Sequence, residues 1–152
     1  MISYEFEEKD YKKLKCLVGD LCKSTDYVLL KKILTNKKCP FYLLYKFHKH
    51  KQSSLRCLVA ENINCPIDIL KEMSKDKDQH VVSDILLNPN CPIDILEKFY
   101  NDKNTLLKNS IALNKKCPIH ILEKLAANNS FDNNILINII KNPNCPISLL
   151  KK

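Results

Sequence analysis

Apolar and polar residues follow one another along this chain in a pattern that returns at regular intervals. In residues 91–116 a Cys-Pro pair is followed by apolar residues at the third, fifth, sixth and ninth positions, which are Ile93, Ile95, Leu96 and Phe99. Apolar residues spaced this way make a stripe along one side of a helix. The spacing predicts a helix of about two to three turns whose stripe, all four residues included, is buried.

A second apolar set predicts a second helix in the same segment. A polar stretch separates the two, and Asp78 and Asn104 stand where their side-chain oxygens can cap the second helix of their segments. The apolar residues of this second helix are Leu106, Leu107, Ile111 and Ala112, and in the preceding segment Val81, Val82, Ile85 and Leu86. The pattern therefore indicates pairs of short helices.

The Cys-Pro pair recurs at separations of 26, 26, 26 and 28 residues, with an asparagine three residues before each cysteine. A period of this length predicts a solenoid of stacked units. Proline suits the first helical position, and asparagine tolerates the left-handed conformation that often ends a helix. We therefore expect this phrase to be the corner between units. The cysteines are Cys39, Cys65, Cys91, Cys117 and Cys145.

The period divides the chain into about five short two-helix units within one domain, 1–152. A terminal unit that is more polar and lacks Cys-Pro is typical of a cap. The expected segments are an N-terminal cap at 1–12, a degenerate unit at 13–38, units at 39–64, 65–90, 91–116 and 117–144, and a half unit at 145–152.

The repeated phrase resembles the units of the leucine-rich repeat variant family. The phrases that carry the likeness are "NINCPIDIL", "NPNCPIDIL", "NKKCPIHIL" and "NPNCPISLL". The resemblance covers residues 36–152 and implies an all-α fold, a right-handed superhelix close to HEAT-like stacking. Some proteins with this repeat carry an amino-terminal iron–sulfur module, but this chain has no closely spaced run of four cysteines to hold one.

The composition bears on compartment and on cysteine chemistry. The chain has 152 residues, 45% of them hydrophobic, but its apolar runs are too short for a membrane span or a signal peptide. We expect a cytoplasmic protein whose eight cysteines are free thiols. Five of them occupy one unit position, about 10 Å apart in a stack, which is too far for a disulfide or a shared metal ion.

No residue pattern points to catalysis. The single glycine, Gly19, excludes glycine-rich phosphate loops, and the motifs of common hydrolases are absent. His48 and His50 read as a solvated loop pair, while His80 and His120 lack a partner carboxylate at a diagnostic spacing. We expect a non-enzymatic protein without a cofactor or a metal.

Charge is the one asymmetric feature. Residues 1–56 hold 13 Lys and Arg against 6 acids, whereas 57–152 hold 12 against 11, and no acid lies between Lys31 and Arg56. We also expect variable positions of the second helices, Lys108 among them, to point outward into a groove. The candidate binding residues are Lys31, Lys32, Lys37, Lys38, Lys46, Lys49, Lys51, Arg56 and Lys108.

Three interpretations of these cations remain open. The first is a scaffold that binds a partner protein, such as an acidic one, through its solenoid surface. The second is non-specific binding of nucleic acid, with lysines on phosphates and Tyr42, Tyr45 or Phe47 against a base. The third is a solvated surface without a ligand. Partner-protein binding is the primary hypothesis, with nucleic acid as its alternative; neither a membrane nor a small-molecule substrate is inferred.

Overall fold

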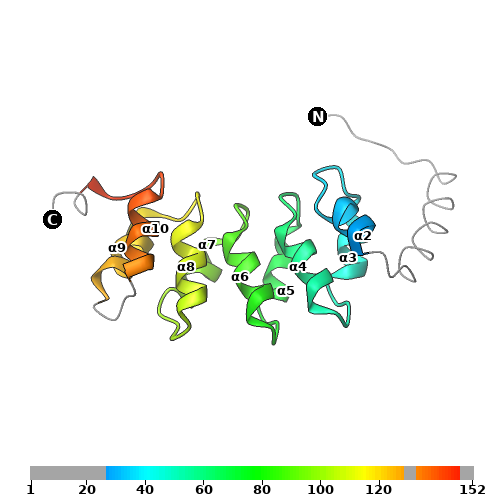
Figure 1. The fold of residues 1–152 in the computed structure, drawn as a ribbon, viewed down its shortest axis with the longest axis horizontal. Coiled ribbons are helices and arrows are strands. Elements are labelled where there is room, and N and C mark those ends of the chain that lie inside the picture. Colours follow the sequence, from blue (N-terminus) through cyan, green and yellow to red (C-terminus); the bar gives the residue numbers. More distant parts are fainter. Residues whose placement is uncertain (1–26, 129–132, 148–152) are drawn as a thin grey trace, which may run out of the picture.

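A computed structural model describes residues 27–128 and 133–147 of the chain. In these residues every regular element is an α-helix, as expected from the sequence (Figure 1). The cap at 1–12 and most of the degenerate unit and of the half unit lie outside the described residues. The helices are α2 (Tyr27–Leu34), α3 (Phe41–Phe47), α4 (Ser53–Glu61), α5 (Ile67–Met73), α6 (Gln79–Leu87), α7 (Ile93–Phe99), α8 (Thr105–Leu113), α9 (Ile119–Ala127) and α10 (Asn133–Lys141).

The helices are of two kinds, and each kind forms its own layer. We call α3, α5, α7 and α9, which follow Cys-Pro, the leading helices, and the others the trailing helices. Successive trailing helices pack against one another in chain order, and each leading helix packs against a neighbouring trailing helix. The arrangement is therefore repeat-like, as expected (Figure 1).

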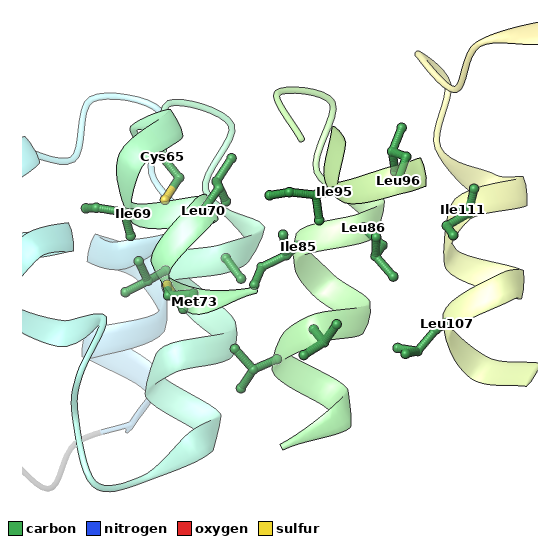
Figure 2. Packing of buried hydrophobic residues seen from close by; sticks show 14 of the residues in the cluster. Cys65, Ile69, Leu70, Met73, Ile85, Leu86, Ile95, Leu96, Leu107 and Ile111 are labelled. Carbon is green, nitrogen blue, oxygen red and sulfur yellow. The ribbon is translucent and has the colours of Figure 1, made fainter. Parts of the chain in front are cut away.

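The core lies between the two layers and runs along the stack. Figure 2 shows Ile85 of α6 beside Ile95 of α7, and Leu86 on the side of α6 that faces Leu107 and Ile111 of α8. These side chains are at most 4% exposed and belong to one continuous cluster. Each unit therefore buries apolar surface against the next unit as well as within itself.

The predicted burial of the stripe is wrong for Ile93, the third residue of its unit. Ile93 is 52% exposed, whereas Ile95 and Leu96 are buried and Phe99 is half-buried. At 3.6 residues per turn, Ile93 lies about 110° around the helix from the middle of the arc that the other three define. It therefore falls beside the stripe and faces solvent.

The proline lies one residue earlier than predicted. Pro66 has φ −58° and ψ 143°, and Pro92 has φ −61° and ψ 145°, so each is the N-cap rather than the first helical residue. Its φ is already helical, but its ψ is extended because the chain must still turn out of the corner. The proline carbonyl accepts the first helical bonds, as from the Leu70 N–H at 3.0 Å.

The predicted caps of the trailing helices are confirmed. The side chain of Asp78 accepts a hydrogen bond from the His80 N–H at 2.9 Å, and that of Asn104 accepts one from the Leu106 N–H at 2.9 Å. Each side chain satisfies a backbone donor that the first turn leaves free. Local spacing was therefore sufficient to place these two residues.

The corner asparagines end the trailing helices in a different way from the one predicted. Asn88 has φ −63° and ψ 128°, which is extended and not left-handed, and no described residue has a positive φ. Its side-chain amide donates to the Ala60 carbonyl at 2.6 Å and to the Asn62 carbonyl at 2.9 Å, both in the preceding unit. Its Oδ1 accepts from the Asn90 N–H at 2.8 Å.

The same three bonds recur at each successive corner, and we call them the asparagine ladder. Asn114 donates to Leu86 and Asn88, and Asn142 donates to Ala112 and Asn114, across 26 to 30 residues. A buried amide offers two donors and an acceptor at one site, which no other small side chain does. The recurring asparagine therefore joins each unit to the previous one.

No helix in the two described segments combines the length and the apolar character that crossing a lipid bilayer requires.

Candidate functional site

The most regular surface feature is a line of large apolar side chains, which we call the apolar row. Each is the first helical residue after Cys-Pro, and each is between 52% and 70% exposed. The row comprises Phe41, Ile67, Ile93, Ile119 and Ile147. Single exposed apolar residues are ordinary on protein surfaces. These five differ from scattered residues because they occupy the same position in successive stacked units.

Polar bridges between neighbouring leading helices flank the apolar row. The Tyr45 hydroxyl of α3 donates to the carboxylate of Asp68 on α5. The Lys71 ammonium of α5 lies 3.3 Å from the carboxylate of Asp94 on α7. The hydrogen bond from Tyr45 is the main cause that holds the pKa of Asp68 below its usual range. The leading helices are thereby linked beside the row while the row itself stays exposed.

The cations that sequence analysis grouped together do not form one patch. Lys37 and Lys38 lie in a corner, whereas Lys49 and Lys51 lie in the loop between α3 and α4. Figure 1 shows that corners and such loops occupy opposite edges of the stack, which we call the corner edge and the loop edge. Lys31, Lys32 and Lys46 are exposed on helices α2 and α3 between these edges.

Arg56 is buried, contrary to the expectation of a surface binding residue. Only 7% exposed, its guanidinium donates to both carboxylate oxygens of Asp76, at 2.6 and 2.9 Å, and to the carbonyls of His50 and Lys51. It thus ties the loop of its own unit to the loop of the next. The planar guanidinium of arginine suits this bidentate contact with a carboxylate, and the contact indicates a structural role for Arg56.

The buried pair fixes the charge of Asp76. Burial opposes ionisation of the carboxyl, but the hydrogen bonds from Arg56 and from the Asp78 backbone N–H outweigh it, so the pKa of Asp76 lies below its ordinary value. A lowered pKa means that the pair stabilises the fold at neutral pH and loses this effect as the pH falls through the pKa of Asp76. Asp76 therefore has a structural role, which is to hold the buried Arg56 guanidinium.

Lys108 is also buried, at 6% exposure, and so is Val82 at the equivalent position of α6. Ser83 and Ser110 are buried as well and share a hydrogen bond of 2.7 Å between α6 and α8. The expected outward groove at these positions is wrong, because each trailing helix is flanked by neighbouring trailing helices. Residues at these positions face the adjacent trailing helix, and the apolar pattern of a single helix does not indicate this contact.

The loop edge contains a cleft of about 560 Å³ between the first two described loops, which we call the basic cleft. His48 in its wall is buried, contrary to expectation: its Nδ1 lies 2.6 Å from the Tyr45 carbonyl and its Nε2 3.0 Å from the Glu72 carboxylate. Lys49 also meets Glu72, at 2.7 Å. The lining residues are His48, Lys49, His50, Lys51, Arg56, Glu72, Met73, Lys75, Asp76 and Lys77.

A second histidine has a carboxylate partner that sequence spacing did not indicate. His120 of α9 lies 3.2 Å from Glu97 of α7, one unit earlier in the chain. These two residues are 23 apart in the sequence, and His48 and Glu72 are 24 apart. The signal that could have found both pairs is the period itself, because residues about one period apart lie side by side in a stack.

The described cysteines are free thiols with no arrangement for chemistry. Burial raises the pKa of Cys39 to about 11 and those of Cys65 and Cys117 to about 12, which keeps the thiols protonated and unreactive. No group of three or more possible metal ligands occurs within 27–128 or 133–147. Cys16 and Cys22 lie outside the described residues.

Comparison of the chain with protein-family models, with curated proteins and with solved structures finds no match.

Proposed function

We propose that this protein is a non-enzymatic scaffold that binds a partner protein through the apolar row. The observation that carries the proposal is the exposure of the same large apolar position in five successive units. A scaffold presents similar contacts at fixed positions along a rigid stack. The buried hydrogen bonds of the asparagine ladder, which join each unit to the one before it, favour such rigidity.

The overall architecture belongs to the same proposal. A right-handed α-α superhelix with a period of 26 residues accords with the Cys-Pro spacing and with the resemblance to the leucine-rich repeat variant family. A cytoplasmic location, one domain over 1–152 and the absence of a cofactor are parts of this proposal that rest on the sequence alone.

The energetics favour a partner that touches several units at once. Full burial of an isoleucine side chain is worth about 1.5–3 kcal/mol, so a side chain that is already half-buried adds about 1 kcal/mol. Association costs consume several kcal/mol before any net affinity results. One member of the row is therefore insufficient, and the regular spacing lets one extended partner surface engage four or five members together.

The double variant Ile67→Lys/Ile93→Lys tests the proposal by quantitative affinity capture from the organism's own extract, compared with wild type. Two lysines in the row remove apolar contact and oppose burial, so we expect at least about tenfold less of the bound partner, equivalent to about 1.4 kcal/mol. Circular dichroism checks that the variant keeps its helices.

The matched control is Leu87→Lys/Leu113→Lys. These leucines are 39% and 48% exposed, are also 26 residues apart, and end the trailing helices α6 and α8. The control should retain the partner. If both double variants lose it equally, or if neither does, the apolar row is not the docking surface.

A further inference from the structure

A second row of equivalent residues lies on the loop edge, independent of the apolar row. Lys51, Lys77 and Lys103 are separated by 26 residues, and each lies in the loop that joins a leading helix to the next trailing helix. All three are exposed, and none has an ion-pair partner among the residues that the structure describes. We call them the lysine row.

The carboxylates of these loops are engaged by the fold. Asp76 pairs with the buried Arg56, and Glu72 pairs with Lys49 and His48. Asp78 and Asp102 turn toward backbone N–H groups, those of His80 and Asn104, at 2.9 and 2.8 Å. Residues 57–152 hold 12 cations against 11 acids, but the loop aspartates are engaged by Arg56 or by backbone N–H groups, whereas the lysine row is exposed.

The loop edge is also hollowed. The basic cleft contains Lys51, Lys75 and Lys77, and a second cleft of about 640 Å³ begins at Lys75 and continues to Lys98 of α7. The two clefts share Lys75 and Glu72, so the hollow continues from the first two loops onto α5 and α7. The acids of the second cleft, Glu72 and Asp94, are paired with Lys49 and Lys71. A flexible anionic chain can lie in such a surface with its charges near successive lysines.

Two of these loops also carry an aromatic ring that is in contact on one side with Phe47 or with the Lys124 ammonium. His50 is half-buried in the first of these loops, and Tyr100, also half-buried, begins the third, with the Lys124 ammonium 5.1 Å from its ring centroid. An acidic peptide needs the lysines but not the rings, whereas single-stranded nucleic acid uses both, because its bases stack on aromatic faces.

We propose that the loop edge binds the phosphate backbone of single-stranded nucleic acid, through the lysine row and the two clefts beside it. Adjacent lysines of the row are about 10 Å apart, the packing distance of neighbouring helices. The loops carry no matched set of base-reading side chains at fixed positions, so the binding is without base specificity. The corner lysines, including Lys37 and Lys38, lie on the opposite edge and take no part in it.

The test is a salt titration of binding by fluorescence anisotropy, with the full chain and 20-nucleotide oligo-U RNA and oligo-dT DNA. Wild type should bind both, with log K falling linearly as log salt rises. The variant Lys51→Gln/Lys77→Gln/Lys103→Gln should bind at least about tenfold more weakly near 0.1 M salt, and its slope should be shallower by about 2, for three lost phosphate contacts.

The matched control, Lys37→Gln/Lys38→Gln/Lys115→Gln, removes the same charge from the corner edge, where all three lysines are exposed. It should bind within about threefold of wild type, as expected for cations that touch no phosphate. Equal losses in the two triple variants would show a general charge effect and overturn the proposal. Two further results would also overturn it: absence of oligonucleotide binding at 50 mM salt, and polyglutamate binding as tight as that of oligo-U.

Discussion

Leu96→Asp is expected to lower the free energy of unfolding by several kcal/mol. Leu96 of α7 is 1% exposed and lies in the core cluster, where α7 packs against α8 (Figure 2). A carboxylate there would be buried without a partner, which is among the most destabilising single changes known. Urea unfolding followed by circular dichroism measures the loss.

The same substitution three residues earlier is the control. Ile93 is on the same helix but 52% exposed, and an acid in the first turn is compatible with the helix dipole. Ile93→Asp should therefore change the free energy of unfolding by no more than about 0.5 kcal/mol. If Leu96→Asp left the melting temperature unchanged, the assignment of buried and exposed positions within the unit would be wrong.

Asn88→Ala is expected to cost about 2–4 kcal/mol. It removes the two donors that serve the Ala60 and Asn62 carbonyls and the acceptor that serves the Asn90 N–H, all at a buried corner. Each buried polar group left without a partner costs about 1–3 kcal/mol. The same urea series measures the change.

Two further variants separate the donors from the remaining contacts of this corner. Asn88→Asp keeps the size of the side chain and its acceptor but sets a carboxylate against two carbonyl oxygens, so at pH 7 it should cost at least as much as Asn88→Ala. Asn90→Ala removes the bond to the Ile63 carbonyl and a long contact from the Lys116 ammonium, both at a more exposed place, and should cost about 1 kcal/mol or less. Equal effects of Asn88→Ala and Asn90→Ala would contradict the role of the asparagine ladder.

Features that depend on residues close together in sequence were predictable. The helical class, the alternation of leading and trailing helices and the caps at Asp78 and Asn104 all follow from spacing within one helix or one loop. Propensity and capping act over a few residues, so one unit contains the information that they need.

Features that depend on the neighbouring unit were missed. The asparagine ladder, the Arg56–Asp76 pair and the His48–Glu72 contact join residues 20 to 30 apart. Neither residue of a pair stands out in the sequence of its own unit, and the two come together only when successive units stack. The same reason explains why Lys108 is buried although its sequence position resembles a surface position.

Sequence analysis grouped the cations by their order along the chain, whereas in the fold they are distributed between the corner edge and the loop edge. Lys37 and Lys49 are close in sequence but lie in a corner and a loop, on opposite edges. Lys51 and Lys103 are distant in sequence but occupy equivalent loops on one edge. In a repeat-like fold, cations should therefore be grouped by their position within the unit.

Site-specific photo-crosslinking tests the proposed docking surface most directly. A benzophenone side chain replaces Ile67, Ile93 or, as a control on the loop edge of the same unit as Ile93, the exposed Asn101. Illumination in the native extract should attach one and the same partner protein at positions 67 and 93, and should not attach it at 101. Attachment of that protein at all three positions, or at 101 alone, would contradict the proposal that the apolar row is where this protein binds its partner.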